Sequence, residues 1–155
     1  MGKQKELKGI AFGILDTFIS RNNDFHGYWG IGILYRHSVE NGDQPVTLDL
    51  INKTISPPSP VLQEMAVHYG NLLEQRLTKR EIPASKVNGC QIILNFNLTE
   101  IDRRTLPQTT HGSPYSCELQ INLANGKLYQ AKRFGWCDPH DPSREARSTR
   151  VDPGK

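Results

Sequence analysis

Residues that could do chemistry are densest between positions 20 and 37. Guanidinium, carboxylate, imidazole, amide and aromatic side chains follow one another there within a few positions. Such a set could supply an anion contact, an orienting amide and an acid–base pair, and its aromatic rings could stack on a ligand or a protein partner. The candidate binding residues are Arg21, Asn22, Asn23, Asp24, His26, Tyr28 and Trp29, with His37 as a second imidazole.

A purely structural interpretation of the same segment stays open. Asn22 or Asn23 could end a helix in the left-handed conformation, Asp24 could form a turn, and Gly27 could let the backbone bend into the next element. A helix end needs only a cap and a glycine, whereas this segment holds many more polar and aromatic residues. We therefore predict that the segment binds a partner, and we assign no residue a catalytic role.

A zinc site is the second constellation considered. Cys137 and His140 are separated by two residues, and His111 with Cys117 could complete a tetrahedral set of ligands. Zinc ribbons have two tight pairs of ligands, but His111 and Cys117 are six residues apart with Pro114 between them. We therefore expect no metal and predict that Cys117 is a small buried side chain.

The third constellation is a divalent-metal nuclease centre formed by Asp102 and Glu118. A lysine would be expected two residues after Glu118, but Gln120 occupies that position. Without this lysine the charge that develops on a phosphorane has no assigned partner, so Glu118 is more simply a cross-strand partner of Lys132. The sequence also lacks a Gly-rich phosphate loop, a nucleophile elbow and an HExxH helix.

The net charge of +3 is small for a dedicated nucleic-acid-binding domain. Basic residues nevertheless occur in groups, and groups that converged in the fold could bind phosphates. The candidate nucleic-acid contacts are Arg76, Lys79, Arg80, Arg103 and Arg104; the other groups are Lys3, Lys5 and Lys8, and Lys127, Lys132 and Arg133. Nucleic-acid binding is therefore kept as the alternative function.

The chain of 155 residues is long enough for one domain with a single core. We predict that residues 1–137 form this domain and that residues 138–155 form a polar mobile tail, because the tail has few aliphatic residues and several prolines. An odd number of widely spaced cysteines predicts a reducing, cytoplasmic compartment. The sequence shows no signal peptide and no apolar run of membrane-spanning length.

Two helices are predicted from apolar residues at helical spacing. Residues 4–21 carry two adjacent apolar stripes, which make a wide face that other elements or a partner chain must cover. Residues 59–80 form the second helix, with Ser59 suited to the N-cap and Pro60 to the first turn. His68 on this helix is predicted to lie on a solvated face.

Two interpretations compete for residues 28–39. Apolar residues recur there with period two, which favours a strand whose hairpin returns over residues 47–51. Asn41 and Gly42 could equally end a helix, but glycines at positions 27, 30 and 32 weigh against one, so we favour the hairpin.

Three further strands are predicted in the second half of the chain. Residues 90–96 form a near-continuous apolar run typical of a central strand, and residues 100–114 form a polar loop. The last two strands flank residues 124–126, where a bulged loop with Gly126 left-handed would pair Ile121 with Tyr129 and Leu119 with Ala131. This register separates Cys117 from Cys137, so no disulfide is expected between them.

These patterns predict an α+β fold with two principal helices packed on a mainly antiparallel sheet, in the order α-β-β-α-β-β-β. We expect a small cytoplasmic binding or accessory protein that acts through protein–protein contacts, as a homo-oligomer or as a subunit of a multicomponent system. No cofactor, metal or membrane contact is expected. A small hydrolytic enzyme using the 20–37 segment is the third hypothesis, after nucleic-acid binding.

Overall fold

The computed structural model describes residues 2–23, 30–98 and 113–137. In chain order the elements are α1 (Gly2–Asn23), α2 (Ile31–Glu40), β1 (Val46–Asp49), β2 (Thr54–Ser56), α3 (Gln63–Lys79), the short 3₁₀ helix η1 (Ala84–Lys86), β3 (Val87–Asn95), β4 (Ser113–Leu123) and β5 (Leu128–Cys137). Three helices and a five-stranded antiparallel sheet confirm the α+β class. The predicted tail over residues 138–155 and most of the predicted loop over residues 100–114 lie outside the described residues, whereas residues 113 and 114 begin β4.

The strand order in the sheet is β2-β1-β3-β4-β5, so β3 is the central strand, as predicted. The register of the β4–β5 hairpin is also confirmed, because Ile121 lies opposite Tyr129 and Leu119 opposite Ala131. Glu118 lies directly opposite Lys132. Gly126 has a φ of 90°, the left-handed conformation that the predicted loop requires.

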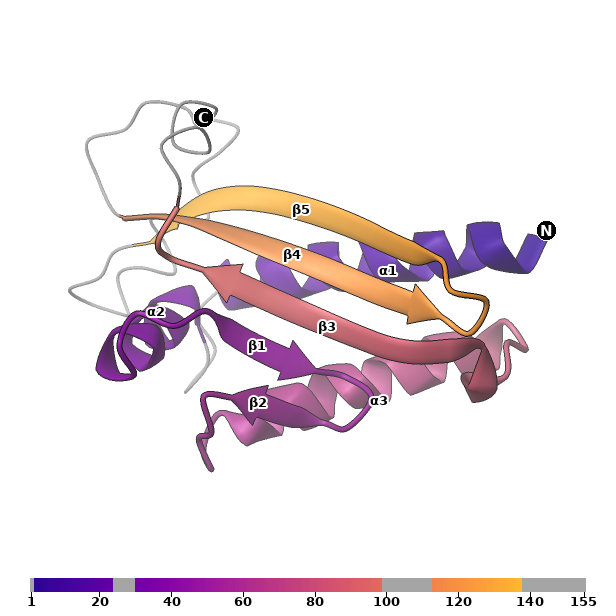
Figure 1. Ribbon diagram of the computed structural model, residues 1–155, viewed down its shortest axis with the longest axis horizontal. Coiled ribbons are helices and arrows are strands. Elements are labelled where there is room, and N and C mark those ends of the chain that lie inside the picture. Colours follow the sequence, from indigo (N-terminus) through magenta and orange to yellow (C-terminus); the bar gives the residue numbers. More distant parts are fainter. Residues whose placement is uncertain (1, 24–29, 99–112, 138–155) are drawn as a thin grey trace.

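Helices α1 and α3 cover one face of the sheet and leave the other face without a described element over it (Figure 1). α1 packs on β4 and β5, and α3 packs on β1 and β2. The two helices also contact each other, with the rings of Phe18 and Tyr69 edge to face at 5.0 Å between centroids. The wide apolar face of α1 is therefore covered within the domain, by the sheet and by α3.

The core lies between these two layers. Its largest fully buried side chains, all less than 2% exposed, are Phe18, Tyr69, Tyr115, Ile10, Ile14, Leu15, Ile31, Leu34, Leu48, Leu50, Met65 and Leu73. Along β3 the alternate residues Cys90, Ile92 and Leu94 are fully buried and face the helices. Burial of this apolar surface is the main force that holds the layers together.

The strand predicted over residues 28–39, and with it the hairpin to residues 47–51, is wrong, because residues 31–40 form helix α2. Ile31, Leu34 and Ser38 are buried at helical spacing, whereas Val39, an apolar position of the period-two pattern, is 46% exposed. Asn41 ends the helix, and its backbone N–H donates to the carbonyl of Ser38. Tertiary packing of Ile31 and Leu34 outweighs the cost of glycines near the helix start.

The one strand expected between this segment and the second helix pairs differently as a result, and β2 was not predicted. The predicted return strand over residues 47–51 corresponds to β1, but β1 pairs with β2 on one side and β3 on the other. The helix predicted over residues 59–80 is confirmed with a later start at Gln63. Ser59 caps the preceding turn, because its Oγ accepts a hydrogen bond from the N–H of Leu62 at 3.1 Å.

Candidate binding surfaces

At the end of α1, the neighbouring candidate residues Arg21 and Asn22 lie in different environments. Arg21 is exposed, whereas Asn22 is 1% exposed and lies inside the helix rather than in a left-handed cap. Asn22 Nδ2 donates to the carbonyl oxygen of Phe18 at 2.8 Å and to the hydroxyl of Tyr69 at 3.4 Å. Asn22 therefore joins α1 to α3. Asn23 ends α1, and Asp24, His26, Tyr28 and Trp29 lie outside the described residues.

α3 places two further ring side chains beside Arg21. The rings of His68 and Tyr69 meet edge to face with 4.8 Å between centroids. Burial and the positive charge of Arg21 lower the pKa of His68, so its imidazole is neutral at physiological pH. Burial raises the pKa of Tyr69 to about 12, against the opposing effects of Arg21 and Asn22. His68 is exposed as predicted, but it belongs to an Arg21–Asn22–His68–Tyr69 cluster that links both helices.

This cluster supports a prediction about Arg21. Because Arg21 is exposed, Arg21→Ala should change the free energy of unfolding by less than about 0.5 kcal/mol. The same substitution should raise the pKa of His68, since it removes a positive charge that disfavours the imidazolium. NMR titration of His68 measures the shift.

Asn22→Ala is the contrasting variant and should destabilise the fold by about 1–2 kcal/mol, because it removes a buried hydrogen bond between α1 and α3. An unchanged His68 titration in Arg21→Ala would show that the two groups do not interact.

His37, the second imidazole of the predicted acid–base pair, makes hydrogen bonds that hold the fold together. It is 9% exposed, and its Nε2 lies 2.6 Å from the carbonyl oxygen of Pro57. A carbonyl only accepts hydrogen bonds, so Nε2 carries a proton and donates it. Nδ1 faces the side-chain amide of Asn41 at 3.5 Å. His37 thus ties α2 to the segment that follows β2, and its Nε2 cannot act as a base in this arrangement.

The described residues contain no group of three or more histidine, cysteine, aspartate or glutamate side chains that could hold a metal ion. Cys117 is fully buried, as predicted, and lies opposite Arg133, whereas Cys137 lies opposite Ser113. The other residues of the two metal hypotheses, namely His111, His140 and Asp102, fall outside the described ranges. Within those ranges, none of the helices is long and apolar enough to cross a membrane.

Sequence reasoning missed one surface of the structure, the sheet face that points away from α1 and α3 (Figure 1). We call it the open face and define it by the outward residues of the five strands. They are Thr47, Asp49, Thr54, Ser56, Gln91, Ile93, Asn95, Pro114, Ser116, Glu118, Gln120, Asn122, Leu128, Gln130, Lys132 and Phe134. Side-chain amides and hydroxyls dominate this face. Alternation along β3 and β4 was the available signal, but it was obscured by Ile93 within the apolar run.

The register aligns the open face in rows that cross the sheet. One row runs Ser56, Thr47, Ile93, Glu118, Lys132, and the next runs Thr54, Asp49, Gln91, Gln120, Gln130. The second row presents three glutamine side chains on adjacent strands, each of which can donate and accept hydrogen bonds. The face carries two carboxylates and one ammonium, so it lacks the positive excess that a nucleic acid would need.

The basic candidates lie elsewhere. Arg76 and Lys79 are in the last turns of α3 and Arg80 follows them, while Arg103 and Arg104 lie outside the described residues. α1 and α3 are antiparallel neighbours, because Asn22 meets Tyr69 while Gly13 lies beside Arg76. The end of α3 is therefore near the start of α1, away from Arg21.

A comparison with known proteins finds no family model, no curated protein and no solved structure that matches the chain significantly.

Proposed function

We propose that the protein is a binding or accessory protein whose open face docks a protein partner. The observation that carries this proposal is a five-stranded sheet with helices on one face and, among the described residues, nothing over the other. A surface of this breadth, made mainly of uncharged polar side chains, offers many hydrogen-bonding groups to a partner. Interfaces between proteins typically carry about ten direct hydrogen bonds.

The chemistry of the open face favours a different protein over a second copy of this chain. Homodimer interfaces are more apolar than other interfaces, and paired sheets normally bury apolar faces against each other. Four of the sixteen defining residues of the open face are apolar, namely Ile93, Pro114, Leu128 and Phe134, whereas nine carry an amide or a hydroxyl. A polar, separately stable partner fits such a face better than a permanent self-association does.

A photo-crosslinking experiment tests this proposal. A photoreactive phenylalanine analogue replaces Gln91 at the centre of the open face, or Gln75 on the exposed surface of α3 as the matched control. In native cells, the analogue at position 91 should give a discrete adduct with another protein, and the analogue at position 75 should not.

A charged variant then checks the site itself. Gln120→Arg places a cation next to Gln91, because the two residues are opposite each other. We expect it to reduce the adduct at position 91 at least tenfold, since an unpaired charge in a desolvated interface is unfavourable, while Gln75→Arg should leave the adduct unchanged. Equal adducts at positions 91 and 75, no adduct at either, or an adduct with a second copy of this chain would each contradict the proposal. Thermal melting establishes that every variant is folded.

A further inference from the structure

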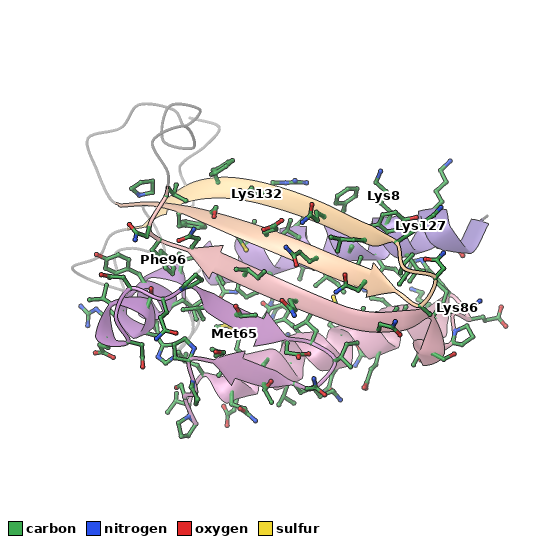
Figure 2. The ribbon with its side chains drawn as sticks, in the orientation of Figure 1. Lys8, Met65, Lys86, Phe96, Lys127 and Lys132 are labelled. Carbon is green, nitrogen blue, oxygen red and sulfur yellow. The ribbon has the colours of Figure 1, made fainter. Side chains whose placement is uncertain are left out.

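Four segments that are distant in the sequence meet at one end of the molecule. They are the first turns of α1, the last turns of α3, the 3₁₀ helix η1 and the turn between β4 and β5 (Figure 1). The backbone N–H of Ala124 donates to the carbonyl of Lys86 at 2.9 Å, which joins η1 to the β4–β5 turn. Figure 2 shows Lys8, Lys86 and Lys127 at this same end.

We call this region the basic end, because its charged side chains are mostly cationic. Its basic residues are Lys5, Lys8, Arg76, Lys79, Arg80, Lys86 and Lys127, and its acidic residues are Glu6 and Glu81. Elsewhere among the described side chains, acidic residues outnumber basic ones. The small net charge of the chain therefore conceals a strong asymmetry, in which one end is distinctly positive.

Two of these cations are supported by packing. Arg76 lies against α1, since a Cβ on Gly13 would be 3.3 Å from its guanidinium Nη1. The ammonium of Lys8 lies over the ring of Phe12, 5.8 Å from the centroid. Both contacts limit the side-chain conformations of these cations before an anion binds. Less conformational entropy is therefore lost on binding.

We propose that the basic end binds the phosphate backbone of double-stranded nucleic acid without reading its sequence. Lysines and arginines from four segments can neutralise several phosphates at once, and release of counterions drives such binding. A duplex is the favoured form, because single strands are usually held by stacking of bases on exposed aromatic rings. Among the side chains whose exposure the structure describes, every phenylalanine and tyrosine is buried or only partly exposed.

The proposal is independent of the open face, and a matched lysine separates the two surfaces. Lys132 lies on the open face about halfway along the edge strand β5, away from Lys8, Lys86 and Lys127 (Figure 2). All four lysines are exposed, so replacement of each by glutamine removes one positive charge and little packing.

The experiment measures binding of the full chain to fluorescently labelled DNA and RNA duplexes, by anisotropy, across salt concentrations from roughly 50 to 200 mM. For the unmodified protein we expect weak binding to both duplexes, with dissociation constants of about 1–100 μM. Each of Lys8→Gln, Lys86→Gln and Lys127→Gln should reduce the slope of log affinity against log salt by about 1. The triple variant should bind on the order of 30-fold more weakly, while Lys132→Gln should match the unmodified protein.

Three results would overturn the proposal. They are no detectable binding to either duplex at the lowest salt concentration, tighter binding to a single strand of the same length, and an equal effect of Lys132→Gln. Preference for one of the two duplexes would support the proposal and identify its natural source as DNA or RNA.

Discussion

Gly70→Ala should destabilise the protein by about 2–3 kcal/mol, although alanine is the better helix former. Gly70 is buried in the middle of α3, where a Cβ would lie 2.7 Å from the carbonyl oxygen of Leu50 and 2.7 Å from Cγ of Lys53. The Lys53 side chain can move, but Leu50 is fixed, because its N–H donates to the carbonyl of Cys90 at 2.8 Å. The helix would have to retreat from the β1–β2 hairpin, and urea unfolding measures the loss.

Gly9→Ala is the matched control, a second glycine within a helix. An added Cβ there meets nothing within 4 Å, so only the gain in helix propensity remains. We expect this variant to be more stable than the unmodified protein by about 0.5–1 kcal/mol. The two substitutions are chemically identical but should have opposite signs. Stabilisation by both would contradict the close approach of α3 to the β1–β2 hairpin.

The elements that could be predicted from the sequence are those whose apolar pattern lies within one short stretch of the chain. α1 and α3 have long apolar stripes, and β3 is a continuous apolar run. The β4–β5 register follows from one glycine and from the apolar residues on either side of it. The segment that forms α2 is short, and its apolar residues fit period two as well as helical spacing. The burial of Leu34 and Ser38 and the exposure of Val39 decide between them, and these depend on the rest of the core.

The candidate surfaces were harder to predict, because each depends on contacts between distant residues. Asn22 is a core residue only because Tyr69, 47 positions away, lies beside it. Nε2 of His37 is hydrogen-bonded to the carbonyl of Pro57, and no pattern of residue spacing in the sequence predicts this contact. The open face becomes recognisable once both helices are known to lie on the same side of the sheet. The basic end likewise requires η1 and the β4–β5 turn to be joined.

The thiols of Cys90 and Cys117 should resist alkylation in the folded protein, because only the thiolate reacts. Burial raises the pKa of Cys90 to about 12 and also raises the pKa of Cys117. For Cys90 at pH 8, the thiolate fraction should be about a thousandfold lower than that of an exposed thiol. Mass spectrometry of the peptides that contain each residue measures the alkylation rates under native and unfolding conditions. Comparable native and unfolded rates would show that these side chains are not enclosed.

The same burial predicts that stability falls with rising pH in the alkaline range. In the unfolded chain both thiols lose their protons near pH 9, whereas the folded protein keeps the proton of Cys90 up to about pH 12. Between these values the unfolded state binds fewer protons, so each thiol lowers the free energy of unfolding by up to about 1.4 kcal/mol per pH unit. Urea unfolding from pH 7.5 to about 10.5 measures the slope. Cys90→Ala should reduce stability near neutral pH, because it leaves a small cavity, and it should also make the decline with pH shallower, so that the difference from the unmodified protein narrows as the pH rises. If the decline is equally steep in Cys90→Ala and in the unmodified protein, the ionisation of Cys90 is not coupled to folding.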